Sequence, residues 1–204
     1  MSGADPEDAQ LVLASASPRR RELLETLGLR VRVVPAGVDE TAAPGEGPEP
    51  YVRRVAAAKA RAVAVRPGTE LPVLGSDTTV TLDGAILGKP RDRDEALAML
   101  GQLSGRTHEV LTAVALAAGG EVQVRVSRSR VRFRSIPRAE AEAYWQTGEG
   151  RDKAGAYGIQ GIGGIFAERL DGSFSGVMGL PVAETELLLR AAGVDVWRHR
   201  RESP

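Results

Sequence analysis

The sequence predicts an α/β fold in which helices flank a β-sheet. Apolar segments short enough for buried strands alternate with segments of helical periodicity, and turns rich in glycine and proline separate them. The length of 204 residues suits one domain, or one core with two lobes. We expect a disordered segment at 1–10, a single domain at 11–196 and a basic tail at 197–204 that frays.

The first half of the chain opens with a strand, a tight loop and a helix. Leu11–Ser15 has the character of a buried strand, and Ser17 and Pro18 suit the N-cap and first turn of a helix that ends at Gly28. The further expected elements are a strand at Arg30–Val34, a loop at Pro35–Pro50, a helix at Tyr51–Val65, strands at Leu71–Leu82 and Ala85–Gly88 joined by a turn at Asp83–Gly84, and a helix at Asp94–Leu103.

A long antiparallel hairpin dominates the second half. His108–Ala118 and Glu121–Phe133 form its arms across Gly119–Gly120, and the second arm alternates valine with polar residues, which predicts one solvated face. The remaining expected elements are a helix at Pro137–Thr147, a folded glycine-rich loop at Gly148–Gly164, a hairpin with arms at Ile165–Arg169 and Phe174–Met178, and a helix at Pro181–Ala192.

Charge and composition exclude several classes of function. Lys plus Arg and Asp plus Glu number 27 each, so the chain lacks the basic surplus typical of general nucleic-acid binding. The absence of cysteine excludes disulfides, thiol nucleophiles and thiolate zinc sites. The two histidines, His108 and His199, are too few for a histidine-rich metal site.

Membrane insertion and secretion are not expected either. The longest apolar stretch, Val110–Ala118, is about half the length that a bilayer requires. The segment Met1–Gln10 carries three acidic residues before the first apolar run, which is the wrong charge for a signal peptide. We therefore expect a cytoplasmic protein that binds neither nucleic acid nor membrane.

Lysine is rare in this chain. Of 27 basic residues only Lys59, Lys89 and Lys153 are lysines, a bias that codon usage explains. Lysine offers a compact point charge and arginine a broad planar fork, so a retained lysine marks a position where arginine fails. The alternative interpretation is chance survival.

Two carboxylates are candidates for chemistry. Asp77 lies within an apolar strand, where aspartate is depleted, and a buried carboxylate needs a cation, a metal or several donors. The alternative is that Asp77 caps a loop at a strand end. Glu40 lies in the loop after the second expected strand and is the weaker candidate, since acidic loop residues are mostly solvated.

A set of cations could bind an anion. Arg19 and Arg20 lie in the first turn of a helix, where their charge opposes the helix dipole unless an anion docks there. The Ser17 hydroxyl could add a donor. Lys59 falls on the apolar face of its helix, and Lys89 follows a strand end. A solvated face for the arginines and snorkelling of Lys59 are the alternative interpretations.

Together these groups predict a polyphosphate site in an α/β cleft. The cations would bind the phosphates, and the carboxylates would hold a divalent metal, which favours metal-assisted phosphoryl chemistry. The sequence contains neither a Walker loop nor a dinucleotide fingerprint, so the site is of another type.

Several motifs, in order over residues 11–190, resemble those of the Maf family of nucleoside triphosphate pyrophosphatases. The motifs are LASASPRR at 13–20 followed by Glu22-Leu23-Leu24, Lys59-Ala60, LGSDT at 74–78, Gly88-Lys89-Pro90, Leu103-Ser104-Gly105, DKAGAYGIQG at 152–161 and VMGLP at 177–181. Each motif alone is weak, but the set is specific and covers nearly the whole chain.

The resemblance implies a fold, a reaction and a cofactor. The fold would be an elongated mixed β-sheet with flanking helices and two lobes around a central cleft, similar to inosine triphosphatases. The reaction would be house-cleaning hydrolysis of a nucleoside triphosphate to the monophosphate and pyrophosphate, with a divalent cation, Mg²⁺ or Mn²⁺. Members often form dimers, so a homodimer is one assembly open to this chain.

The resemblance also assigns roles to residues of the cleft. Asp77 matches the proton acceptor, and Glu40, Lys59 and Lys89 match residues around the phosphates and the metal. Glu40 and Asp77 would be the metal ligands.

Three further positions mark the subgroup that acts on dTTP and UTP, and they are occupied here by Arg19, Thr78 and Gln160. Thr78 directly follows Asp77, so the strand must end or bulge there if both side chains are to face one ligand from the same side of the sheet. Gln160 has a donor and an acceptor that suit the edge of a pyrimidine.

Two other functions stay open. One is a 7-methyl-GTP or broad-specificity pyrophosphatase on the same fold. The other is a non-catalytic nucleotide-binding regulator of cell division and septum formation. The joint presence of Glu40, Lys59, Asp77 and Lys89 favours an enzyme, because a scaffold has no need of all four.

Overall fold

The computed structural model describes residues 9–201 of the chain. Over these residues seven strands form one mixed sheet in the order β2-β1-β3-β5-β6-β7, with β4 paired to β3. The three parallel strands are β2 (Val31–Val33), β1 (Leu11–Leu13) and β3 (Val73–Leu82). The antiparallel strands are β4 (Ala85–Leu87), β5 (Thr107–Ala118), β6 (Glu121–Phe133) and β7 (Ala167–Asp171). The predicted α/β class with a mixed sheet is confirmed.

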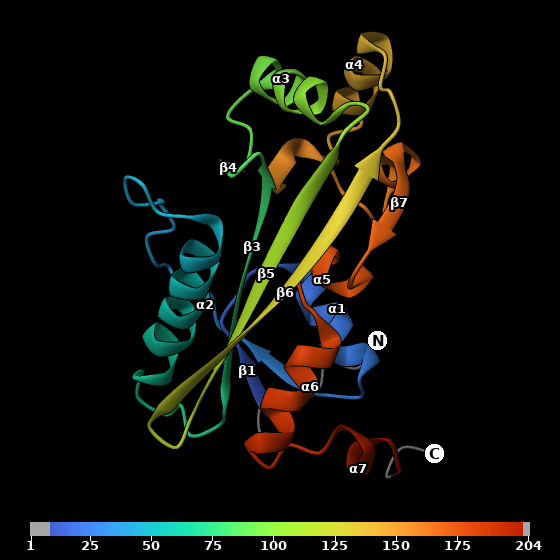
Figure 1. Ribbon diagram of the computed structural model, residues 1–204. Helices are drawn as coiled ribbons and strands as arrows, with labels where there is room; N and C mark the ends of the chain where they lie inside the picture. Colours follow the sequence, from blue (N-terminus) through green and yellow to red (C-terminus); the bar gives the residue numbers. More distant parts are fainter. Residues whose placement is uncertain (1–8, 202–204) are drawn as a thin grey trace.

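Helices cover both faces and one end of an elongated sheet (Figure 1). On one face lies α2 (Pro48–Ala64), and on the other lie α1 (Pro18–Thr26), α5 (Phe174–Met178) and α6 (Val182–Ala191). The end near β4 and β7 carries α3 (Arg93–Leu103), α4 (Arg138–Gln146) and the short 3₁₀ segments η2 (Ala154–Ala156) and η3 (Ile162–Phe166).

The buried apolar residues form three clusters that follow this arrangement. One lies between α2 and the sheet, and a second lies between the sheet, α1 and α6. The third fills the end of the molecule and includes Leu100, Phe133, Tyr144 and Phe166. The first two clusters support one lobe and the third supports the other, which agrees with the expected two-lobed shape.

Small residues bring α2 close to β3. A Cβ atom on Gly75 would overlap the backbone oxygen of Ala56 and the backbone nitrogen of Ala60, so only glycine fits at this crossing. Because the helix backbone approaches the strand so closely here, Lys59 is carried against Asp77, two residues further along the strand. The sequence predicted Lys59 on the buried face of its helix, and this is confirmed.

The sheet opens along one edge of β3. β1 pairs with β3 only at Val73 and Leu74, and β4 pairs with it only from Val80 to Leu82. Between these two pairings the described chain places β5 on one side of β3 and no strand on the other. This open edge is where a cleft between the two lobes reaches the middle of the sheet.

The hairpin expected at Ile165–Met178 is wrong in its second arm. Ala167–Asp171 is a strand, but it pairs with β6, and Phe174–Met178 is the helix α5. The Ser173 side chain caps this helix by accepting a hydrogen bond from Gly176 N, and Gly179 ends it with a positive φ of 117°. The serine cap and the closing glycine bound a short helix where the turn at Asp171–Gly172 had suggested the second arm of a hairpin.

The single solvated face expected for β6 is also wrong. Exposed side chains occupy one face up to Arg125 and the other face from Arg128 onward. The valines of the first half pack toward α2, whereas Val131 and Phe133 belong to the end cluster on the opposite face. The strand therefore changes its buried face because different lobes cover its two halves.

The described part of the chain ends in helix α7 (Val196–Arg201), where a fraying tail was expected from residue 197. Residues 1–8 of the expected disordered segment, and residues 202–204 of the tail, lie outside the described residues. Over residues 9–201, no helix combines the length and the apolar character that a membrane crossing requires.

Candidate functional site

A cavity of about 700 Å³ lies at the open edge of β3. Its walls come from the loop between β1 and α1 and the first turn of α1, from the loop before α2, from α2, β3 and β5, from the segment after β4, from the glycine-rich loop around η2, and from the end of α5. All nine predicted site residues line it: Ser17, Arg19, Arg20, Glu40, Lys59, Asp77, Thr78, Lys89 and Gln160. The fold therefore brings together groups that are spread over most of the sequence.

All three lysines of the chain line this same cavity. Lys59 enters from α2, Lys89 follows β4, and Lys153 precedes η2. Three lysines from separate elements gather at one site while 24 arginines occupy the remaining basic positions. This gathering argues against chance survival, because a compact ammonium fits beside phosphates and buried carboxylates where a planar guanidinium does not.

Lys59 joins the two predicted metal-binding carboxylates. Its Nζ lies 2.8 Å from Oδ1 of Asp77 and 2.9 Å from Oε1 of Glu40. Lys59 and Asp77 are buried, whereas Glu40 is exposed. Burial raises the pKa of Asp77, and the charge and hydrogen bond of Lys59 oppose that rise.

The second carboxylate oxygen of Asp77 has no partner. Oδ2 is buried and makes no hydrogen bond, an arrangement that costs free energy unless a ligand completes it. Oδ2 is thus the atom of this pair that is free to bind a cation or to accept a proton from water.

Glu40 comes from a long loop that α2 holds in place. The Tyr51 hydroxyl donates to the backbone oxygen of Glu40 at 2.9 Å, and Arg54 donates to the backbone oxygen of Thr41 at 3.0 Å. Arg54 also forms a two-pronged ion pair with Glu46 of the same loop. Two side chains on one helix therefore fix the backbone on which Glu40 stands.

Arg20 is clamped rather than free. Its Nε donates to the backbone oxygen of Gly179 at 2.8 Å, and its two terminal nitrogens donate to Ser15 Oγ at 3.0 Å and Thr78 Oγ1 at 3.3 Å. Burial lowers the pKa of Arg20, and Asp77 and Glu40 oppose that shift through their charge. An arginine held this rigidly supplies a fixed positive field to the cavity.

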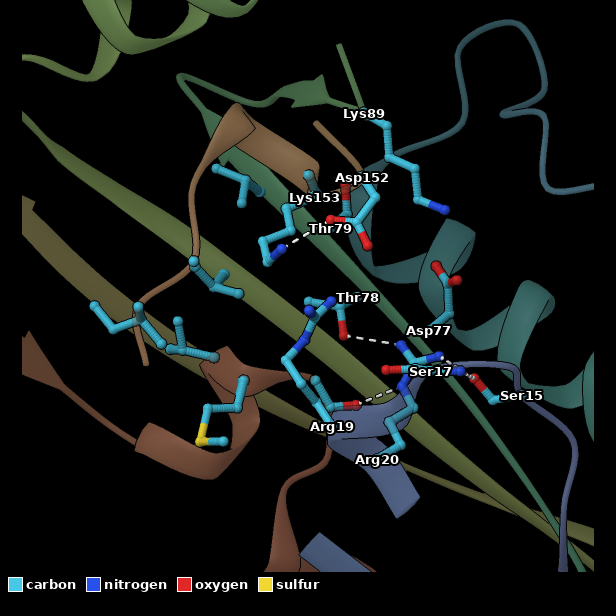
Figure 2. A pocket seen from close by; sticks show the side chains of 18 of the residues that line it. Ser15, Ser17, Arg19, Arg20, Asp77, Thr78, Thr79, Lys89, Asp152 and Lys153 are labelled. Carbon is cyan, nitrogen blue, oxygen red and sulfur yellow. Dashed lines mark hydrogen bonds and ion pairs between the residues drawn. The ribbon is translucent and has the colours of Figure 1, made fainter. Parts of the chain in front are cut away.

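Arg19 and Lys89 differ from Arg20 because their side chains make no hydrogen bond or ion pair in the described structure. Figure 2 shows them reaching the cavity from different elements. Ser17 occupies the N-cap position of α1 as predicted, but its side chain makes no capping hydrogen bond. Ser17 and Arg19 are therefore available to an anion at the start of the helix, and Lys89 to an anion elsewhere in the same cavity.

Thr78 reaches the cavity without the bend that the sequence analysis required. β3 pairs with β5 in unbroken register through Asp77 and Thr78, so the two side chains lie on opposite faces of the sheet. The Thr78 hydroxyl contacts Arg20 and lies 2.9 Å from Thr112 Oγ1, on the face away from Lys59. Both residues line the cavity because it wraps around the open edge of the strand.

Gln160 lies in the glycine-rich loop between η2 and η3. Its side chain is exposed and lines the cavity without a hydrogen-bond partner in the described structure. This loop is folded, as its interleaved Tyr157, Ile159 and Ile162 predicted. Tyr157 and Ile159 are buried, whereas Ile162 is exposed.

Sequence reasoning missed three residues of the cavity wall. Ser15 accepts a hydrogen bond from Arg20, and Tyr51 donates one to the backbone oxygen of Glu40. Asp152 forms an ion pair of 2.8 Å with Lys153. Asp152 and Lys153 stand in the DKAGAYGIQG motif, and the rarity of lysine was the signal that pointed to Lys153. Nothing in the sequence separated Tyr51 from an ordinary helix residue.

The site fits a divalent cation. The described residues contain no group of three or more His, Cys, Asp or Glu side chains placed to hold a metal. Mg²⁺ typically binds one or two protein carboxylates together with substrate phosphates, and Glu40 and Asp77 supply two. The partnerless Oδ2 of Asp77 is an oxygen ligand of the kind that Mg²⁺ and Mn²⁺ prefer.

Comparison with known proteins gives consistent matches over nearly the whole chain. The family of Maf-like proteins matches residues 10–192. A dTTP/UTP pyrophosphatase of Hahella chejuensis is 49% identical over 199 residues, which is 97% of this chain and 99% of the relative. A dTTP/UTP pyrophosphatase of Methylococcus capsulatus is 53% identical, and the match covers 94% of this chain and 95% of the relative. A dTTP/UTP pyrophosphatase of Saccharophagus degradans is 50% identical, and the match covers 94% of this chain and 92% of the relative.

Proposed function

We propose, from the premise that this chain belongs to the family of Maf-like proteins, that it hydrolyses nucleoside triphosphates to the monophosphate and pyrophosphate. The relatives named dTTP/UTP pyrophosphatase, about half identical over nearly their full length, support dTTP and UTP as preferred substrates. The observation that carries the proposal is the Lys59-bridged pair of carboxylates within a cavity that also presents Arg19 and Lys89.

Asp77 is the proton acceptor in this mechanism. Lys59 occupies Oδ1, so the partnerless Oδ2 is the oxygen left to take the proton of the attacking water. The water oxygen forms a bond to the α-phosphorus while the bond from that phosphorus to the bridging oxygen breaks. The nucleoside monophosphate and pyrophosphate are the products.

A divalent cation, Mg²⁺ or Mn²⁺, held by Glu40 and Asp77 would supply neutralisation of the negative charge on the phosphates. Arg19 and Lys89 bind the triphosphate chain and stabilise the charge that develops on the leaving pyrophosphate. The Ser17 hydroxyl and the start of α1 add neutral donors. Asp77 stands on β3 and is held by Lys59, so this carboxylate is arranged before the substrate arrives.

The base is recognised on the side of the cavity away from Lys59. Gln160 can pair with a carbonyl and an N–H of a pyrimidine at once, and its exposed amide has no protein partner to give up. Arg19 lines the same cavity from α1, so its charge can also serve the end of the triphosphate nearest the base. Thr78 acts through Arg20, which its hydroxyl helps to hold.

The proposed function also bears on the extent of the catalytic domain, the location of the protein and its assembly. Residues 11–196 are the catalytic domain, because every residue that lines the cavity falls between Ser15 and Gly179. The balanced charge supports a cytoplasmic protein that binds neither nucleic acid nor membrane. A homodimer is the assembly that we propose.

A panel of substrates with two product assays tests the proposal. The purified protein is given dTTP, UTP, 7-methyl-GTP and ATP with Mg²⁺, with Mn²⁺ and with a chelator, and pyrophosphate and inorganic phosphate are both measured. We expect metal-dependent release of pyrophosphate, fastest from dTTP and UTP. Faster turnover of 7-methyl-GTP would favour the first alternative. Binding without turnover of any nucleotide would favour a non-catalytic regulator.

A further inference from the structure

Glu149 lies at the centre of the glycine-rich loop although it does not line the cavity. It follows α4, and its carboxylate turns back into the loop. Oε1 accepts hydrogen bonds from the Tyr144 hydroxyl at 2.8 Å and from Gly163 N at 3.0 Å, and Oε2 accepts one from Ile162 N at 2.9 Å. One partly buried carboxylate thus satisfies two backbone N–H groups that lie thirteen and fourteen residues further along the chain.

The loop is built around this carboxylate. A Cβ atom on Gly161 would overlap the carboxylate of Glu149, and one on Gly158 would lie 3.1 Å from Oε1. A Cβ on Gly163 would lie 2.8 Å from the Tyr144 hydroxyl. Gly161 and Gly163 are therefore explained by the room that Glu149, Tyr144 and the loop backbone occupy, whereas the tight space at Gly158 is shared with the Lys153 side chain.

The carboxylate is held in its charged form. Burial works to raise the pKa of Glu149, but the N–H of Gly163, the Tyr144 hydroxyl and the N–H of Ile162 outweigh it and keep the pKa below its usual range. Hydrogen bonds to a charged acceptor are about twice as strong as neutral ones, so the loop is tied firmly.

Two contacts connect this arrangement to the cavity. The Tyr144 hydroxyl, besides donating to Glu149, accepts a hydrogen bond of 3.0 Å from Gly158 N. Lys153 donates from Nζ to the backbone oxygen of Glu149 and forms an ion pair with Asp152 on the cavity wall, and Figure 2 shows these two side chains together. Gln160 lies between anchored residues on both sides, namely Gly158 and Ile162.

We propose that Glu149 is a positioning residue for base specificity: it fixes the loop backbone so that Gln160 faces the cavity. The inference rests on the proposed role of Gln160 in reading the base. Glu149 touches no substrate in this account, so its effect must pass through Gln160. The predicted consequence is a loss of preference for pyrimidine nucleotides, seen mainly in KM, with kcat changed little.

The test compares Glu149→Gln with Tyr144→Phe, and uses Glu142→Gln as the matched control. Gln keeps the shape of Glu149 but replaces one accepting oxygen by an NH₂ group, so one N–H of the loop loses its acceptor. Tyr144→Phe removes only the hydroxyl between Glu149 and Gly158. Glu142 lies on the same helix as Tyr144, but its ion pairs with Arg93 and Arg138 are at the surface.

We expect Glu149→Gln to lower kcat/KM for dTTP and UTP about tenfold and for ATP less than about twofold. Tyr144→Phe should have a smaller effect in the same direction, and Glu142→Gln should leave the ratio unchanged. In a Gln160→Ala background the Glu149→Gln change should cost dTTP turnover less than about twofold, because the residue through which it acts is already gone.

Hydrogen exchange of backbone amides supplies a readout that does not depend on activity. In Glu149→Gln the amide that loses its acceptor, either Ile162 N–H or Gly163 N–H, should exchange at least about tenfold faster than in the unchanged protein. If Gln160→Ala lowers the dTTP-to-ATP ratio but Glu149→Gln leaves it intact, the inference is overturned and the proposed function stands. If Gln160→Ala leaves the dTTP-to-ATP ratio intact, Gln160 does not read the base. Faster amide exchange in Glu149→Gln would then show only that Glu149 supports the loop.

Discussion

The ammonium nitrogen of Lys59 lies 2.8 Å from Oδ1 of Asp77, and both side chains are buried. This contact occupies one oxygen of the carboxylate and leaves the other, Oδ2, without a partner. A buried charge needs a partner to remain ionised, so Lys59 keeps Asp77 available as a base while leaving one oxygen free. In the proposed mechanism this pair leaves Oδ2 as the atom that accepts the proton.

Asp77→Asn should abolish most of the activity without unfolding the protein. The amide keeps an oxygen for Lys59 but cannot accept a proton from water, and it is a poorer cation ligand than a carboxylate. We expect kcat for dTTP to fall on the order of a hundredfold or more. Steady-state kinetics together with a thermal melting curve measure the effect. Full activity in this variant would remove Asp77 from the mechanism.

Lys59→Arg and Lys89→Arg should not behave as conservative changes. Lys59 is 6% exposed and its nitrogen serves two carboxylates, so a guanidinium would displace one of them. We expect kcat/KM to fall by about tenfold or more in each variant. Arg190→Lys is the control. Arg190 forms an exposed ion pair on α6, so this change should leave kcat/KM unaltered. Wild-type rates in both lysine variants would mean that codon chance, and not function, kept these lysines.

Gln160→Ala should narrow the preference for pyrimidine nucleotides. A lost two-point contact to a base edge leaves polar groups of the base without partners, which typically costs about 1–3 kcal/mol. We therefore expect kcat/KM for dTTP and UTP to fall roughly tenfold to a hundredfold, with a much smaller change for ATP. Equal losses on all nucleotides would place Gln160 in phosphate binding or in folding.

The free energy of unfolding should decrease as the pH is lowered, because His108 is buried. Its ring is buried beside Phe133 and Tyr157, and its Nε2 lies 2.8 Å from the Tyr157 hydroxyl. Burial lowers the pKa of His108 from 6.5 to about 4. Below pH 6.5 the unfolded chain therefore binds a proton that the native state excludes, and the free energy of unfolding falls as pH decreases toward 4.

This shift of the pKa corresponds to about 3 kcal/mol lost between pH 7 and pH 4. Urea unfolding at a series of pH values measures it. His108→Gln keeps a polar group near Tyr157 but does not titrate, so its unfolding free energy should depend less on pH over this range. Identical pH dependence in the two proteins would show that His108 titrates normally in the native state.

Much of the secondary structure was predictable because its signals are local. The glycine pair at 119–120 sets the long hairpin, Ser17 and Pro18 start α1, and the period of apolar residues places Lys59 on the buried face of α2. Asp77 stood out because aspartate rarely occurs within an apolar strand. Such features depend on a few neighbouring residues, which a single sequence contains.

The geometry of the site was less predictable because it depends on distant contacts. Arg20 is clamped by Gly179, which lies 159 residues away, and no local pattern reveals this pairing. The open edge of β3 follows from where β1 and β4 stop pairing, so Asp77 and Thr78 share a cavity without any bulge. The order of the glycine-rich loop likewise depends on Glu149, whose spacing from Gly163 carries no motif of its own.

Hydrolysis of dTTP in water enriched in ¹⁸O shows directly which phosphorus atom the water attacks. The products are separated and the mass of each is measured after partial turnover with Mg²⁺. Attack at the α-phosphorus, with the proton passing to Asp77, predicts that the ¹⁸O enters dTMP and that the pyrophosphate carries none. Label in the pyrophosphate would mean attack at the β-phosphorus, and release of inorganic phosphate in place of pyrophosphate would mean cleavage of a different bond. Either result would contradict the account.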